Sequence, residues 1–151
     1  MTISKDLKKL GYGYVGQVEW VINRIAELID LGRSDEIVDI LGSECFLEFG
    51  EGSPFPGRMN GIEAVSKFFI DRANNSQLKT KHIVSNLNIS VFEEGKIEAK
   101  YIFTVYRGAA GSHYPENLII ADVIDVYSAK KDSLKLIQRT VTPSFQVKLK
   151  I

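Results

Sequence analysis

The sequence predicts an α+β domain in which N-terminal helices pack on a mostly antiparallel sheet. In the first half of the chain apolar residues recur at three- and four-residue steps, whereas in the second half apolar and polar residues alternate. Glycine and proline cluster between these stretches and mark turns. With 151 residues, 44% of them hydrophobic and 25% charged, the chain can bury one core, so we expect a single domain over residues 1–151.

Two helices are predicted near the N-terminus. From Gln17 to Leu31 the apolar residues form a broad helical face, and Gly32 ends the helix. Ser34 is a suitable cap for a second, short helix from Asp35 to Leu41, and the acidic residues in its first turn suit the helix dipole.

A third helix is predicted after a strand and a loop. Cys45 to Phe49 has the pattern of a short strand, and the segment after it is rich in glycine and proline as far as Asn60. Gly61 then begins the helix, whose buried face is expected to carry Ile62, Val65, Phe68 and Phe69.

Four strands are predicted in the second half of the chain. They cover His82–Phe92, Lys96–Arg107, Asn117–Tyr127 and Leu134 to about Val141. Pro143 is expected to end the last of them, because proline cannot donate to a sheet ladder.

Alternation along these strands places polar side chains on the core face. Tyr101 and Arg107 continue the apolar row of their strand, and Asp125 lies on the inward face of the next one. That next strand is apolar on its outer face as well, although no helix follows that could cover it. We therefore expect a homodimer through the outer face of the sheet, formed by Leu118, Ile120, Ile124 and Val126.

Composition argues against several classes of function. Lys and Arg together number 19, and so do Asp and Glu, so no net charge favours nucleic acid or an acidic membrane. The single cysteine, Cys45, permits neither an internal disulfide nor a cysteine-rich metal site, and a buried apolar role suits it better than that of a nucleophile. No apolar run approaches the ~20 residues that span a bilayer, and a signal peptide is not evident, so we expect a cytoplasmic protein.

Residues 11–16 spell GxGxxG, the fingerprint of dinucleotide-binding folds. That motif requires a preceding strand and a following helix within a βαβ unit. Here a polar segment near the N-terminus precedes it, and no alternation of strands and helices follows. We interpret it as a glycine-rich lead-in to the first helix and expect no cofactor.

Asp30 and His82 are the candidate acid–base residues. Asp30 ends the first helix along its apolar stripe, where an acid opposes the helix dipole, so it is either a solvated acid or a pocket carboxylate. His82, at the start of a strand, is either a structural residue or a catalyst. Within hydrogen-bonding distance, the carboxylate would fix the tautomer of the imidazole and favour its charged form, which gives a general acid–base pair.

Arg107 and Asp125 also have two interpretations. They form a buried ion pair with each other, or they bind substrate. The other histidine, His113, lies at a loop tip and is expected to be solvated. Two histidines so far apart, without HExxH-type spacing, predict no metal site.

The order of helices and strands is that of a cone-shaped α+β barrel, and four pieces of sequence support a closer resemblance. These are Ile29-Asp30-Leu31-Gly32, Asn60-Gly61-Ile62, the strand His82-x-Val84-x-Asn86-x-x-Ile89-x-Val91, and the hairpin Ala121-x-Val123-x-Asp125 with Leu134-x-Leu136-x-x-Arg139-x-Val141. On these pieces the chain resembles the SnoaL-like branch of the nuclear transport factor two-like superfamily over roughly residues 15–142.

The resemblance implies a mostly apolar cavity, usually in a dimer. It also implies cofactor-free proton transfer beside a carbonyl, as in scytalone dehydratase-like dehydratases, polyketide cyclases and ketosteroid isomerase-like isomerases. The acid–base pair of the dehydratases matches Asp30 and His82, which favours a pocket role for both. The dehydratase tyrosine, second histidine and cavity asparagine fall at Ile29, Arg107 and Val123, so the scytalone reaction itself is not expected.

Two functions remain open. In the first, the protein is a lyase or isomerase in which His82 moves a proton on a small, largely apolar carbonyl compound and Asp30 orients the imidazole. Arg107 and Tyr101 would hold the developing oxyanion. The substrate-binding candidates are Arg107, Tyr101, Asp125 and Asn86. In the second, the chain is a non-catalytic module that binds a small ligand or serves as a dimeric accessory protein.

Overall fold

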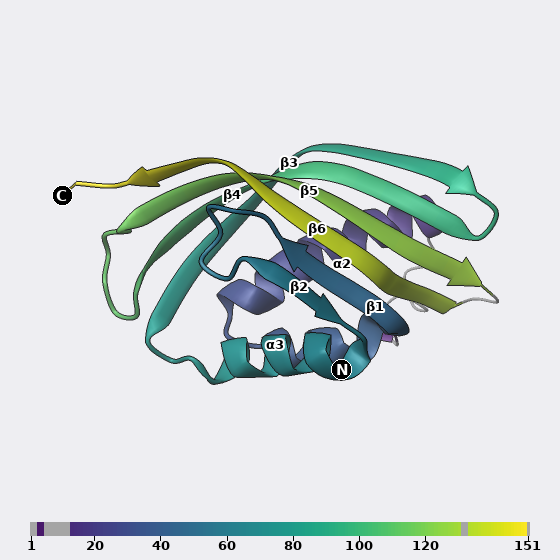
Figure 1. Ribbon diagram of the computed structural model, residues 1–151, viewed down its shortest axis with the longest axis horizontal. Coiled ribbons are helices and arrows are strands. Elements are labelled where there is room, and N and C mark those ends of the chain that lie inside the picture. Colours follow the sequence, from purple (N-terminus) through teal and green to yellow (C-terminus); the bar gives the residue numbers. More distant parts are fainter. Residues whose placement is uncertain (1–2, 5–12, 131–132, 151) are drawn as a thin grey trace.

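Helices pack on one side of a curved sheet (Figure 1). The computed structural model describes residues 3–4, 13–130 and 133–150. The helices that position the site are α2 (Tyr14–Asp30), the 3-10 helix η1 (Ser34–Ile40) and α3 (Ile62–Asn74). The strands are β1 (Leu41–Phe49), β2 (Gly57–Asn60), β3 (Leu78–Glu93), β4 (Lys96–Ala109), β5 (Asn117–Lys130) and β6 (Ser133–Lys148).

The sheet has the strand order β2-β1-β6-β5-β4-β3. β1 and β6 run parallel, and the other neighbouring pairs are antiparallel. The predicted α+β class, with helices on a curved and mostly antiparallel sheet, is confirmed. The sheet is open and does not close into a complete barrel, because β2 and β3 each pair with only one strand.

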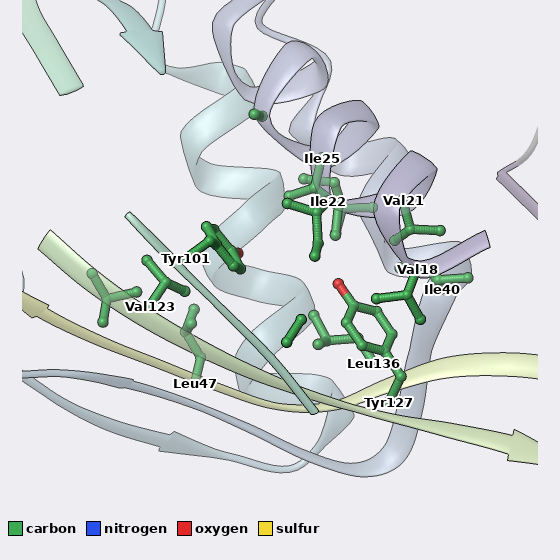
Figure 2. Close-up of a cluster of buried hydrophobic side chains, with 14 of the residues drawn as sticks. Val18, Val21, Ile22, Ile25, Ile40, Leu47, Tyr101, Val123, Tyr127 and Leu136 are labelled. Carbon is green, nitrogen blue, oxygen red and sulfur yellow. The ribbon is translucent and has the colours of Figure 1, made fainter. Parts of the chain in front are cut away.

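The core fills the space between α2 and the inner face of the sheet (Figure 2). Among the side chains labelled in Figure 2, those of α2 and of the strands β4 and β5 are at most 3% exposed: Val18, Val21, Ile22, Ile25, Tyr101, Val123 and Tyr127. Fully burying one such side chain stabilises the fold by about 1.5–3 kcal/mol. This packing fixes α2 on the sheet, and with it Asp30, the last residue of the helix.

The second helix differs from its prediction in three respects. It is a 3-10 helix, and Leu41, expected as its last residue, is the first residue of β1. Ser34 does not cap it, because the buried hydroxyl donates a hydrogen bond to the carbonyl oxygen of Phe69 at 2.6 Å. A buried hydroxyl needs a partner, and α3 supplies one where the helix meets η1.

The first two strands also differ from prediction. β1 begins at Leu41, four residues before the expected Cys45. Residues 57–60, expected in a loop, form the edge strand β2, which pairs with β1. Glycine and proline upstream of residue 57 mark the turn between the two strands, and this turn is shorter than the composition suggested.

Pro143 does not end the last strand, which continues to Lys148. The β5–β6 register shifts where Pro143 lies opposite Ala121. On its other side β6 pairs with β1 only as far as Val141, which lies opposite Phe49. Pro143 therefore occupies a part of β6 that has one neighbouring strand, where a missing N–H is tolerated.

Of the GxGxxG segment, Gly13 caps α2 and Gly16 lies inside that helix, whereas residues 11 and 12 lie outside the described residues. Within the described ranges, no helix combines the length and apolar character needed to cross a membrane.

Candidate active site

Asp30 and His82 meet where α2 ends above β3. The Nδ1 atom of His82 lies 2.6 Å from Oδ1 of Asp30, and the backbone N–H of His82 donates to Oδ2 at 2.8 Å. Both side chains are largely shielded, with 11% of Asp30 and 12% of His82 exposed. The carboxylate therefore holds both the ring and the backbone of the histidine.

Thr80 and Arg72 extend this pair into a chain of hydrogen bonds. The Thr80 hydroxyl donates to Oδ1 of Asp30 at 3.0 Å and accepts a hydrogen bond from Arg72 at 3.1 Å. Sequence reasoning missed both residues. Thr80 could have been identified from its position two residues before His82, because residues two apart in a strand lie on the same face.

In β3 the core-facing residues are at even-numbered positions near His82 and at odd-numbered positions nearer the end of the strand. Asn86 has a φ of 55°, and the β3–β4 register shifts between Ser85 and Asn88. Such a bulge switches which residues face the core, so Val84 packs on the core before the bulge and Leu87 after it. Asn86 itself is exposed at the bulge and is not among the residues that line the cavity described next.

A cavity of about 110 Å³ opens beside His82. Its walls are mostly apolar and include five phenylalanine rings: Phe49, Phe55, Phe68, Phe69 and Phe103. The His82 ring packs edge-on against Phe103, with their centroids 5.0 Å apart. Because Asp30 occupies Nδ1 and no other described residue bonds the ring, Nε2 is the nitrogen open to a bound molecule.

Three arginines also line the cavity: Arg72, Arg107 and Arg139. The guanidinium carbon of Arg107 lies 5.7 Å from the centre of the Phe55 ring. Burial, together with the like charge of Arg72, lowers the pKa of Arg107. Burial also lowers the pKa of Arg72, against the opposing effect of Asp30.

Asp125 forms an ion pair with Arg139, not with Arg107. Arg139 donates two hydrogen bonds of 2.8 Å to the two carboxylate oxygens, and the hydroxyls of Tyr101 and Tyr127 donate to Oδ2 at 2.9 and 3.0 Å. All four residues are buried. Asp125 and Arg139 lie directly opposite each other on β5 and β6, so the register of the hairpin was the signal for this pair.

Burial and the charge of Asp125 shift the pKa of each of its partners in the buried cluster, which are Arg139, Tyr101 and Tyr127. Burial raises the pKa of both tyrosines well above the ordinary value, and the Asp125 carboxylate adds to the effect. Burial alone would lower the pKa of Arg139, but Asp125, Tyr101 and Tyr127 together outweigh it, and the pKa is raised. Tyr101, Tyr127 and Arg139 therefore keep their protons, and Asp125 accepts hydrogen bonds from all three.

Apart from Asn86, the predicted site residues fall into two groups. Asp30, His82 and Arg107 meet at the cavity, with His82 and Arg107 in its wall. Tyr101 and Asp125 lie in the buried cluster and are not among the lining residues. His113 is exposed in the turn after β4. Among the described residues, no three His, Cys, Asp or Glu side chains gather in a way that could hold a metal ion.

The SnoaL-like domain family matches residues 15–140 of the chain. This match covers the helices from residue 15 onward, most of the cavity residues and most of the sheet. The chain belongs to the SnoaL-like domain family. No curated protein matches the sequence of this SnoaL-like protein.

Solved structures share the fold of this SnoaL-like protein at low sequence identity. A putative scytalone dehydratase from Novosphingobium aromaticivorans is 12% identical, with a TM-score of 0.75 over 97% of this chain and 93% of that one. A hexachlorocyclohexane dehydrochlorinase, LinA-type3 from Novosphingobium barchaimii, is 14% identical, with a TM-score of 0.72 over 95% and 94%. ActVI-ORFA from Streptomyces coelicolor is 17% identical, with a TM-score of 0.71 over 88% and 98%.

Proposed function

We propose that this SnoaL-like protein is a cofactor-independent lyase or isomerase that transfers a proton on a small, largely apolar carbonyl compound. The observation that carries the proposal is the 2.6 Å contact between His82 and Asp30 at the wall of an apolar cavity. A carboxylate-bound imidazole beside a shielded cavity is the usual arrangement of a general base.

His82 and Asp30 have different roles in the proposed proton transfer. With Nδ1–H donated to Asp30, the lone pair of Nε2 accepts the proton from the carbon next to the carbonyl. The electrons of the broken C–H bond move into an enolate, and the imidazolium returns the proton to another carbon or to a leaving group. Asp30 holds the tautomer and stabilises the imidazolium while it is charged.

The developing oxyanion needs a positive partner inside the cavity. Tyr101, an initial candidate, donates its hydroxyl to Asp125, so the proposal assigns this role to Arg107. A fixed charge in a water-poor site stabilises an enolate more strongly than water does.

The structural neighbours support elimination as the reaction type. One is named a putative scytalone dehydratase and another a hexachlorocyclohexane dehydrochlorinase. Loss of water and loss of hydrogen chloride both require removal of a proton from carbon, which is the step that we assign to His82.

Hydrogen–deuterium exchange tests the proposal without a known substrate. Small ketones and β-hydroxy ketones are incubated with the protein in D₂O, and exchange or elimination is followed by NMR. We expect turnover that falls about a hundredfold or more in His82→Gln and also falls in Asp30→Asn, with His113→Gln as the control. Wild-type rates equal to the blank, or an unaffected His82→Gln variant, would instead favour the ligand-binding function.

We also propose that the protein forms a homodimer through the outer face of the sheet. Leu118, Ile120 and Ile124 are half-buried there, whereas Val126 is already buried at 6% exposure. Phe145 pairs with Ile120 and Val147 with Leu118, so these residues share the face, and they are 66% and 45% exposed. An apolar surface of this kind, which Asp122 interrupts between Ile120 and Ile124, favours a protein partner, and its centre lies nearer Ile120 than Val126.

A further inference from the structure

Arg107 is a half-buried cation that lacks a counter-charge within the described part of the chain. Its guanidinium lines the apolar cavity and lies over Phe55, and it makes no side-chain hydrogen bond or ion pair with a described residue. A guanidinium placed in apolar surroundings without a partner is costly. Its position is therefore better suited to binding an anion than to stabilising the fold.

The charges around the cavity do not balance. Arg139 is neutralised by Asp125, and Arg72 reaches Asp30 through Thr80. Arg107 has no such carboxylate, so the cavity carries an excess of one positive charge when His82 is neutral. One excess charge matches a monoanion.

We propose that Arg107, in addition to holding the enolate oxygen, binds a carboxylate of the substrate, so that the natural ligand is a small acid with an apolar body. The planar guanidinium has the fork geometry that a carboxylate matches. Arg72, the second cation in the wall, adds attraction for the same group. This inference rests on the proposed function for the reaction itself, but the anion site stands on the cavity and its charges alone.

The sheet register places the anion site close to the reacting centre. Thr80 pairs with Arg107 and His82 pairs with Val105, so His82 and Arg107 are diagonal neighbours on one face of β3 and β4. Diagonal neighbours lie about 7–8 Å apart at the backbone, within the reach of long side chains. The carboxylate of the substrate therefore lies within a few bonds of the carbon that His82 deprotonates.

The volume of the cavity limits the apolar part of the ligand. About 110 Å³ is available, which is smaller than the ~150 Å³ that accommodates benzene in an engineered protein cavity. The enclosed space therefore suits a short branched chain, and a ring or a larger group would extend through the mouth.

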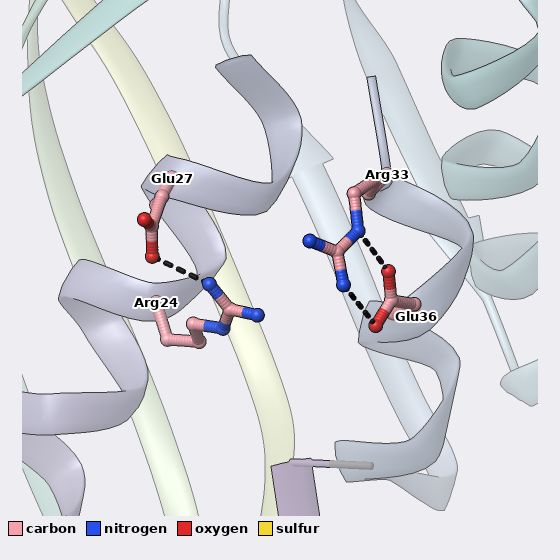
Figure 3. A network of polar contacts seen from close by, with 4 residues as sticks. All are labelled: Arg24, Glu27, Arg33 and Glu36. Atoms are coloured by element: carbon pink, nitrogen blue, oxygen red, sulfur yellow. Dashed lines mark hydrogen bonds and ion pairs between the residues drawn. The ribbon is translucent and has the colours of Figure 1, made fainter. Parts of the chain in front are cut away.

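Benzoate and benzamide form a suitable pair of probes, since they share ring and shape but differ in charge. Calorimetry or NMR titration on the full chain should give benzoate a Kd at least tenfold lower than that of benzamide. Arg107→Gln should abolish this preference, and Arg107→Lys, which keeps the charge but not the fork, should retain part of it. The control is Arg24→Gln, because Arg24 pairs with Glu27 at 2.6 Å on the helix surface (Figure 3); it makes the same change in net charge and should keep the preference.

Equal affinity for the two probes in the wild type, no binding of benzoate, or an unchanged preference in folded Arg107→Gln would each overturn the anion site. Because the wild-type comparison needs no variant, the test stands even where a substitution at Arg107 unfolds the protein. Benzoate preference without proton exchange in any carbonyl acid would leave the anion site standing and refute the proposed reaction. Exchange on neutral ketones without a preference for benzoate would refute the anion site and leave the proposed reaction standing.

Discussion

The Nδ1 atom of His82 lies 2.6 Å from Oδ1 of Asp30, although 52 positions separate the two residues in the chain. Asp30 ends α2 and His82 belongs to β3, so the packing of helix on sheet brings them together. The same carboxylate accepts the His82 backbone N–H and the Thr80 hydroxyl. Asp30 therefore ties the end of α2 to the sheet as well as orienting the imidazole.

Asp30→Asn should lower the free energy of unfolding by about 1–3 kcal/mol. The amide nitrogen would face groups that now donate to the carboxylate, which leaves a shielded donor without an acceptor. Urea denaturation measures the loss. Asp71→Asn is the control, since Asp71 pairs with Lys67 on the exposed face of α3 and should cost about 0.5 kcal/mol or less. Equal losses in the two variants would contradict the structural role of Asp30.

Arg139→Met should destabilise the protein by about 3–5 kcal/mol, because it leaves the Asp125 carboxylate buried without its ion-pair partner. Adding Asp125→Asn should recover part of that loss. The amide oxygen still accepts from the hydroxyls of Tyr101 and Tyr127 but carries no charge. Thermal or urea denaturation distinguishes the variants, with Arg24→Met as the control, since Arg24 is partly exposed on the surface of α2. A double variant no more stable than Arg139→Met would contradict this account.

Tyr101 and Tyr127 should resist ionisation in the folded protein, because burial raises the pKa of each well above the ordinary value. The folded state then holds protons that the unfolded state releases above pH ~10, so stability should fall as pH rises beyond that value. Absorbance of tyrosinate should show these two residues titrating only as the protein unfolds. Tyr101→Phe should remove one of the delayed tyrosines, and smooth ionisation of all six tyrosines before unfolding would refute the prediction.

Cys45 should be unreactive toward thiol reagents in the native state. It is 1% exposed, and burial raises the pKa of the thiol, so little thiolate is present at neutral pH. Reaction with a disulfide reagent should become fast only after denaturant is added. Rapid labelling of the folded protein would show that β1 opens readily or that the thiol is accessible.

The proposed homodimer should be visible by sedimentation at micromolar concentration. Ile120→Arg, in the centre of the apolar outer face, should give a monomer, because the charge would be buried at the interface. Val15→Arg is the matched control, since Val15 is 50% exposed on α2 and lies on a different element. A wild-type monomer, or a dimer that survives Ile120→Arg, would exclude this interface.

The sequence by itself determined the order of the helices and of every strand except β2, and the inward rows of β4 and β5. Periodicity is a local property, so alternation along residues 97–105 was enough to identify the buried face. The position of Asp30 at the end of a helix and of His82 on a strand was readable in the same way.

Tertiary structure decided which polar groups meet. Ser34 had the local features of a cap, but its hydroxyl bonds Phe69, 35 positions away. Pro143 had the local features of a strand end, but the strand continues because β1 stops alongside it. The sequence allowed Asp125 to pair with Arg107, but the register of the hairpin places Arg139 opposite Asp125 and leaves Arg107 in the cavity wall. Each outcome depends on register and helix docking, which balance many small contacts across the whole fold and leave no signal in any one segment.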